Sequence, residues 1–142
     1  RGIVMRVKKI LAVSLVTVSF ICAVLVVVQL RERNKMRDYI KMADRVFRSD
    51  FSLLCNNLNK SESEEVNEEN IKRAYVCFSI FSLTSFSNEY DLNRIVNRLY
   101  ELSGEKALYR ELDKSTIEKL NRLGHDPHND ALLKEIYDDF FN

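Results

Sequence analysis

Apolar residues follow two different patterns along the chain, and the first is an unbroken run. From Ile10 to Leu30 there are 21 positions without a charged residue. As a helix this run rises about 31 Å at ~1.5 Å per residue, close to the thickness of the hydrocarbon core of a bilayer. Ser14, Thr17 and Ser19 fit such a helix, because a hydroxyl can bond back to a helix carbonyl. The rest of the chain is too short and too polar to cover the run, so we predict a transmembrane helix.

The second pattern begins after this run and repeats at helical spacing. Its apolar positions recur every three or four residues: Met36, Ile40, Ala43, Phe47, Phe51, Leu54 and Leu58. This spacing predicts an amphipathic helix over 31–60 that turns one face toward a core. A strict seven-residue repeat of that face would put Asp50 and Asn57 on the seam, which disfavours a long coiled coil. No Gly or Pro occurs between Gly2 and Gly104, so the two helices can be continuous.

The most apolar segment after residue 60 is 71–86, and its pattern fits two structures. Positions at helical spacing are Ile71, Ala74, Tyr75, Phe78 and Phe81. The alternating residues that would suit a strand are Val76, Phe78 and Ile80. No second strand is evident, and a lone strand would leave its backbone groups unpaired. We therefore predict a buried central helix.

Shorter apolar stripes predict the remaining helices. Their core-facing positions are Leu92, Ile95, Val96, Leu99 and Leu102; then Ala107, Leu108 and Leu112; then Ile117, Leu120 and Leu123; and last Leu132, Leu133, Ile136, Tyr137, Phe140 and Phe141. The expected N-terminal signals are Ser61 with Glu64, Ser87 or Asn88, Ser115 with Glu118, and Asp126 with Pro127. Gly104 and Gly124 are expected as left-handed residues that end helices.

These patterns predict an all-α protein. An N-terminal transmembrane helix is followed by a small antiparallel helical bundle or helical array. We divide the chain into a basic tail (1–9), a transmembrane anchor (10–30), a juxtamembrane amphipathic helix (31–60) and the rest of the helical domain (61–142), which packs with 31–60.

The charges are unevenly distributed although the whole chain carries only +1. Residues 1–30 have a balance of +4, residues 31–48 a balance of +4, and residues 49–142 a balance of −7. A basic head on an acidic body disfavours nucleic-acid binding, which normally uses a basic recognition surface. Directly after a span the nearest anions are lipid headgroups. We expect headgroup contacts from four residues: Arg31, Arg33, Lys35 and Arg37.

The start of the chain resembles a secretory signal, with a short basic region before an apolar core. The apolar run is longer than a signal core and ends in Gln29-Leu30-Arg31, which is not a cleavage site of small residues. Cys22 lacks the small preceding residue of a lipoprotein site. We therefore predict an uncleaved signal-anchor, with Cys22 buried in the membrane. The signal-like start places the domain on the extracytoplasmic side, which we adopt, while the count of positive flanking residues favours the cytoplasmic side.

Residues that could support chemistry are few. Cys55 and Cys77 are expected at different heights of a helical hairpin, as two buried thiols. The sequence has no Gly-rich nucleotide loop, and no pair of cysteines has zinc-ligand spacing. The weak metal candidates cluster in one turn: His125, Asp126, His128 and Asp130. Asp126 and Asp130 are equally explained by helix capping and by the positive end of a helix. We predict no catalytic residue, no cofactor and no small-molecule substrate.

The C-terminal helix offers the only partner contact that the sequence suggests. Phe140 and Phe141 together make an apolar band wider than a peripheral helix needs. We assign Phe140 to the core and Phe141 to an exposed contact.

The function that fits these features best is a bitopic membrane protein. Its helical domain would bind a protein partner or a second copy, in a bacterial-type cell-envelope assembly or as a sensor-like module. One alternative is a metal-dependent hydrolase centred on His125 and His128. The other is a small membrane-active, toxin-like protein whose span is the effector.

Overall fold

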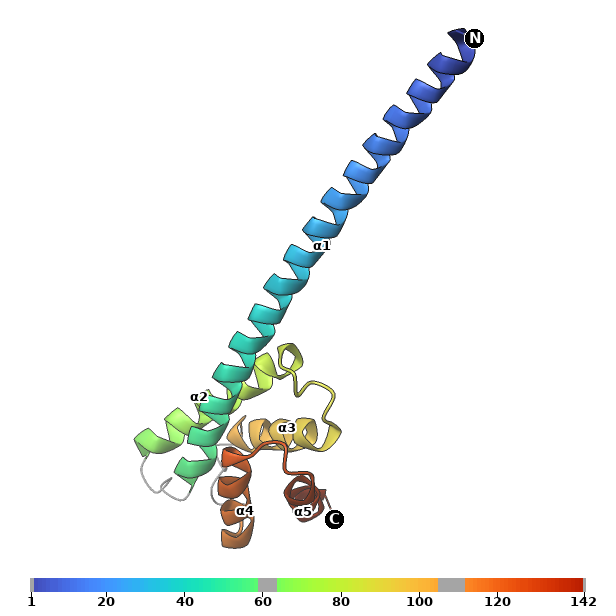
Figure 1. Cartoon of the computed structure of the whole chain (residues 1–142). Coiled ribbons are helices and arrows are strands. Elements are labelled where there is room, and N and C mark those ends of the chain that lie inside the picture. The colour runs from blue at the N-terminus through green and yellow to red at the C-terminus, as the bar shows by residue number, and fades with distance from the viewer. Residues whose placement is uncertain (1, 59–63, 105–111, 142) are drawn as a thin grey trace. The chain divides into compact units, whose positions relative to one another are not determined.

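The computed structural model describes the backbone of residues 2–58, 64–104 and 112–141, with side chains from residue 13 in the first range and from residue 66 in the second. All regular structure in these ranges is helical, as predicted (Figure 1). The helices are α1 (Gly2–Asn57), α2 (Glu64–Ile80), a 3-10 turn η2 (Phe81–Leu83), α3 (Tyr90–Gly104), α4 (Lys114–His125) and α5 (Asp130–Phe141). The chain divides into two compact units, Arg1–Asp38 and Tyr39–Asn142.

The first unit is the N-terminal part of α1. Every described side chain from Val13 to Asp38 is exposed in the chain, including large apolar ones such as Phe20. The Thr17 hydroxyl donates to the Val13 carbonyl at 2.9 Å, which is the back-bonding expected of a hydroxyl in an apolar helix.

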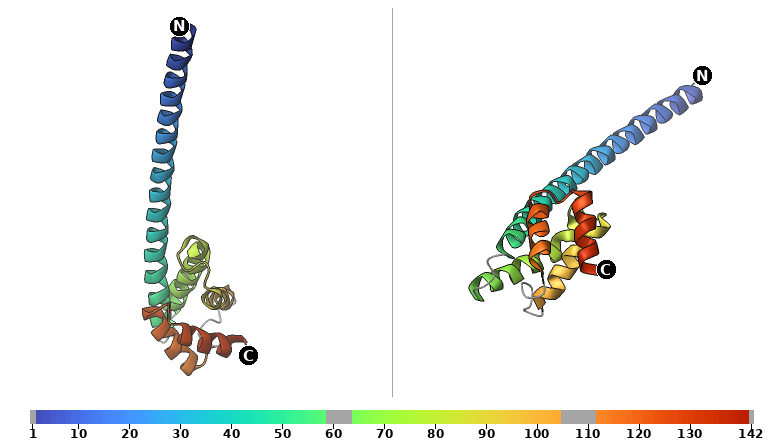
Figure 2. Two further views of the ribbon diagram at one scale, coloured as in Figure 1. Left: turned by 45° about the vertical axis from the view of Figure 1, so that its right-hand side comes forward. Right: turned by 90° about the horizontal axis from the view of Figure 1, so that it is seen from below.

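The second unit is a packed helical array around the C-terminal part of α1 (Figure 2). Helix α2 packs on α3, and α5 packs on both α3 and α4. The core stripe predicted on α1 is confirmed from Phe47 onward, because Phe47, Phe51, Leu54 and Leu58 are all buried. Met36 is exposed and lies in the first unit, so the stripe begins later than the sequence indicates.

Aromatic rings form the centre of this core. The ring of Phe47 lies 5.3 Å from those of Phe51 and Phe86 and 5.6 Å from that of Phe81. Such pairs add about 0.5–1.5 kcal/mol each beyond the burial of their area. This cluster therefore joins α1 to η2 and to the turn that follows it.

The predicted core face of α2 is wrong in part. Ala74 and Phe81 are buried, but Tyr75 and Phe78 are 57% and 41% exposed. The face that packs on the core carries smaller side chains: Asn70, Ala74 and Cys77. Small residues allow α2 to approach its neighbours closely, whereas the sequence pattern favoured the bulkier ones. The helix also ends at Ile80 and not at residue 86.

The core faces of the later helices are mostly confirmed. All five predicted residues of α3 are buried, as are those of α4: Leu92, Ile95, Val96, Leu99, Leu102, Ile117, Leu120 and Leu123. In α5, Leu132, Leu133 and Ile136 are buried and Phe140 packs partly against the core. The predicted short helix around Ala107 and Leu108 lies outside the described residues.

Several predicted helix ends differ from the structure. The N-cap of α4 is Asp113, whose carboxylate accepts from the Thr116 N–H at 2.6 Å, and not Ser115. This bond lowers the pKa of the Asp113 carboxyl, because it stabilises the charged form. Asn129 caps α5 by accepting from the Leu132 N–H at 3.1 Å. Pro127 consequently lies in the turn before the helix and not at its first position.

Helix α3 begins at Tyr90, and the Glu89 carbonyl accepts from the Asn93 N–H at 3.0 Å. The predicted caps Ser87 and Asn88 therefore lie in the preceding turn. The predicted pair of Ser61 with Glu64 falls partly outside the described residues.

Gly124 serves packing and not helix termination. It lies within α4, and a Cβ built on it would stand 3.1 Å from the Cys55 Cβ and 3.2 Å from the Ser52 Cα of α1. The missing side chain thus lets α4 approach the backbone of α1. Gly104 is the last residue of α3 and, like Gly124, lacks the left-handed φ that the sequence suggested.

Candidate interaction surfaces

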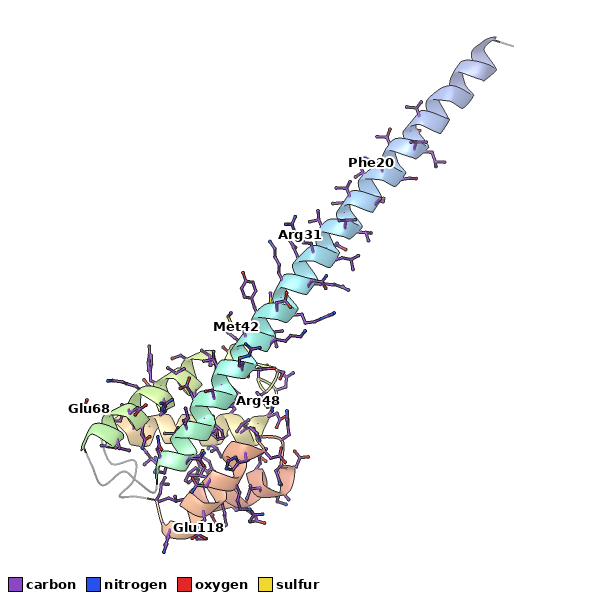
Figure 3. All side chains as sticks on the ribbon, turned by 60° about the vertical axis from the view of Figure 1, so that its left-hand side comes forward. Phe20, Arg31, Met42, Arg48, Glu68 and Glu118 are labelled. Atoms are coloured by element: carbon purple, nitrogen blue, oxygen red, sulfur yellow. The ribbon has the colours of Figure 1, made fainter. Side chains whose placement is uncertain are left out.

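The apolar part of the first unit is the strongest candidate surface. One described helix is long and apolar enough to cross a membrane, near the N-terminus, and its most apolar window has no buried residue. Phe20 is 69% exposed in the middle of the predicted span (Figure 3). Apolar surface of this extent normally contacts lipid or another protein.

The predicted headgroup contacts follow this apolar surface directly. All four of their side chains are exposed: Arg31, Arg33, Lys35 and Arg37. At helical spacing Arg31 and Lys35 share one side of α1, and Arg33 and Arg37 share the opposite side, just beyond residue 30. This arrangement fits contact with phosphate headgroups.

The four metal candidates do not converge. His125 and Asp126 are exposed at the end of α4, where the Asp126 N–H donates to the carbonyls of Arg122 and Leu123. Asp130 begins α5. No group of three His, Cys, Asp or Glu side chains in the part of the chain that the structure describes could hold a metal ion.

His128 belongs instead to a polar cluster that joins three segments. The Arg48 guanidinium lies 3.3 Å from His128 Nε2, and Nδ1 lies 2.9 Å from a Glu89 carboxylate oxygen. Because a guanidinium can only donate hydrogen bonds, Nε2 of His128 is the acceptor. The ring proton is therefore on Nδ1, which donates a hydrogen bond to the Glu89 carboxylate. The imidazole also lies 4.6 Å from the Phe86 ring. These contacts tie α1 to the turn before α3 and to the turn before α5.

A second polar contact reinforces the same junction. The Ser85 N–H and hydroxyl donate to the two carboxylate oxygens of Asp44 at 2.7 and 2.8 Å. Nothing in the sequence pattern pairs residue 44 with residue 85. Only the fold brings these groups together, and their role is to hold the turn before α3 against α1.

The two cysteines of the second unit are free and buried, as predicted. Burial raises the pKa of the Cys77 thiol to about 12, and the nearby Asp50 carboxylate adds to this while Arg73 opposes it. Burial, together with Cys77, also raises the pKa of Cys55. Both thiols therefore remain protonated at neutral pH and are poor nucleophiles.

An exposed aromatic patch lies between α2 and α3, and sequence reasoning missed it. The rings of Phe78 and Tyr100 stack with centroids 4.3 Å apart, and Tyr75 lies 6.1 Å from Tyr100. Beside them is a groove of about 530 Å³ with a largely apolar lining that includes Ile71 and Val76. The signal was present in the sequence, since Tyr75 and Phe78 are three residues apart, but it was assigned to the core.

Phe141 is half-buried and not exposed as expected. The Arg94 guanidinium lies 4.6 Å from the centre of its ring, and the Tyr137 ring lies 4.8 Å away. Phe141 therefore already has partners within the domain. Its proposed contact with a further protein stays a prediction.

Comparison with known proteins gives no relative. No family model, no curated protein and no solved structure matches the chain.

Proposed function

We propose that the chain is a single-pass membrane protein whose helical domain binds other proteins. The observation that carries this proposal is the exposed apolar part of α1, joined in sequence to a domain that buries its own core. Burying an apolar side chain contributes about 1.5–3 kcal/mol. Among the described residues, the apolar side chains of the first unit are not buried, and we propose that surrounding lipid supplies this contribution.

Anchoring is tested by alkaline extraction of membranes from cells that produce the full chain. We expect the chain to stay with the membrane pellet at its full mass, because an uncleaved span resists extraction. Release into the supernatant at full mass would contradict the anchor. Growth arrest on production of residues 5–48 alone would instead favour the toxin-like alternative.

The exposed aromatic patch supports the binding role. Aromatic residues are enriched at the centres of protein interfaces. A photo-reactive residue in place of Tyr75 should give one discrete crosslinked product in cells, and Phe78→Asp should abolish it. The same residue in place of Glu118, which is exposed on α4, serves as the matched control (Figure 3). Crosslinks of equal yield at both positions, or at neither, would contradict this role.

The side of the membrane follows from the signal-like start, and we propose that the domain is extracytoplasmic. A Glu118→Cys variant in a Cys22→Ser background should then react in intact cells with a maleimide that does not cross membranes. Cys55 and Cys77 do not interfere, since both are buried. Reaction only after lysis would place the domain in the cytoplasm, as the positive-inside count indicates.

A further inference from the structure

A second apolar stripe runs along the part of α1 that belongs to the packed domain. Its apolar members are Tyr39, Met42, Val46 and Leu53, all exposed, with Met42 at 67% (Figure 3). Ser49, also exposed, completes a spacing of 3, 4, 3 and 4 residues. This is the spacing of the a and d positions of a coiled coil.

The stripe lies on the face of α1 away from the domain core. At 100° per residue, Val46 and Leu53 lie roughly 80° to 160° from the core residues Phe47, Phe51 and Leu54. The α1 helix of the domain thus has two apolar faces, and the domain core covers one of them. The second face repeats every seven residues, as the seam of a coiled coil does. The core-facing residues of the same helix do not keep this period, and for that reason a long coiled coil was disfavoured for that face.

We propose that this stripe pairs with the same stripe of a second copy, forming a parallel two-helix contact. The proposal rests on the membrane anchor proposed above. Two copies anchored with the same topology both carry residues 39–53 the same number of residues after the span, which favours a parallel pairing in register. In a parallel pair the two-fold axis runs along the helices, so residues at the a and d positions meet their own counterparts.

Charges beside the stripe suit this arrangement. With Tyr39 and Val46 at a positions, Arg45 occupies a g position and Asp50 the following e position. In a parallel pair, g of one helix faces e of the other, so Arg45 meets the opposite charge of Asp50. Arg45 is exposed, while Asp50 bonds to Arg73 of its own domain at 2.8 Å through one carboxylate oxygen. The other oxygen is the acceptor for Arg45 of the second copy.

The length of the stripe explains why the membrane matters. Two heptads bury few side chains, so pairing through them gains too little to offset the cost of association in dilute solution. Confinement to a membrane raises the effective concentration of one copy around another. Pairing is therefore expected of the anchored chain.

The test is disulfide crosslinking of the full chain in vesicles, in a Cys22→Ser background. Ser49→Cys places a thiol in the stripe with little change in size, and Lys41→Cys places one on an exposed position outside it. We expect mild oxidation to give dimers at position 49 at least about tenfold faster than at position 41, because pairing raises the effective thiol concentration. Equal rates at the two positions would reveal random collision and overturn the proposal.

A charge in the stripe provides the second variant. Met42→Glu should abolish the crosslink at position 49, because two carboxylates would meet on the seam, whereas Lys41→Glu should leave it unchanged. Neither side chain is buried, so both variants should fold. A crosslink that survives Met42→Glu would contradict the proposal.

Alkaline extraction of the same vesicles separates this proposal from the one on which it rests. A chain that resists extraction but crosslinks at neither position overturns the pairing and leaves the anchor intact. A chain that is extracted overturns both, because the parallel alignment then has no cause.

Discussion

Phe20 and Phe51 are the same residue type in the same helix, yet their surroundings are opposite. Phe20 is 69% exposed in a unit where every described side chain is exposed, whereas Phe51 is completely buried and its ring stacks on that of Phe47. Hydrophobicity therefore does not distinguish the two units, because both are rich in apolar residues. What differs is whether the chain itself provides the apolar surroundings.

The largest effect is expected from two charges in the first unit. Ile21→Lys with Val24→Lys should raise the free energy of membrane insertion by about 5–7 kcal/mol, since each charge at a helix centre costs about 2.5–3.5 kcal/mol. The measurement is the fraction of chain inserted into microsomal membranes. Met36→Lys with Met42→Lys, which also exposes two new charges, should not change insertion. Unchanged insertion of the first variant would show that this unit does not enter lipid.

Removal of a ring should affect the two units differently. Phe51→Ala should lower the free energy of unfolding of the helical domain by about 3–5 kcal/mol, the range for a buried Phe. Phe20→Ala should leave it unchanged. Denaturant titration of the full chain in detergent micelles, followed by circular dichroism, measures both. Equal losses would mean that Phe20 belongs to the domain core.

The buried thiols predict how the stability of the second unit depends on pH. Both thiols have raised pKa values in the folded state. Their contribution to the free energy of unfolding is therefore fully present below the ordinary pKa near 9. It decreases above that pH, because the same thiols deprotonate in the unfolded chain. The free energy of unfolding should decrease by about 1.4 kcal/mol per pH unit for each thiol above pH ~9.

Cys77→Ala should halve this slope. Cys22→Ala, in the first unit, should not change it. A slope that both variants leave unaltered would show that other groups cause the alkaline loss of stability.

The smallest effect concerns packing density within the second unit. Gly124→Ala should lower the free energy of unfolding by about 1–3 kcal/mol, because the new methyl group meets Cys55 and the backbone of Ser52. Gly104→Ala should be neutral or stabilising by up to about 1 kcal/mol, since nothing lies within 4 Å and Ala favours a helix. Thermal unfolding compares the two variants. Only the Gly124→Ala variant is expected to be less stable than the original chain. A stabilised Gly124→Ala variant would show that the α1–α4 contact is loose.

The fold could be predicted wherever large apolar residues repeat at helical spacing. This held for the core stripe of α1 from Phe47 and for α3 from Leu92 to Leu102. It failed in part on α2, where Tyr75 and Phe78 are exposed and Cys77, which was not predicted, packs inward. A hydrophobic pattern reports size and polarity, but the distance between helices decides which side chains fit.

The candidate site residues were harder to predict, because most depend on contacts between distant segments. The turn with His128 looked like a metal candidate since its residues are close in sequence. In the fold, His128 instead meets Arg48 and Glu89, which lie 80 and 39 residues away. The exposure of residues 13–30, by contrast, follows from the sequence alone, because a continuous apolar run leaves no polar face for solvent.

The central claim is that the apolar part of α1 lies in the hydrocarbon of a membrane, and Cys22 tests it most directly. Cys22 is the one exposed native thiol, since Cys55 and Cys77 are buried. In unsealed vesicles that contain the full chain, a charged maleimide should leave Cys22 unmodified and should react with it once the lipid is dissolved in a denaturing detergent. A Lys41→Cys variant should react at position 41 in the same unsealed vesicles, before detergent is added. Modification of Cys22 there at the rate of position 41 would mean that the segment is surrounded by water, and would contradict the account.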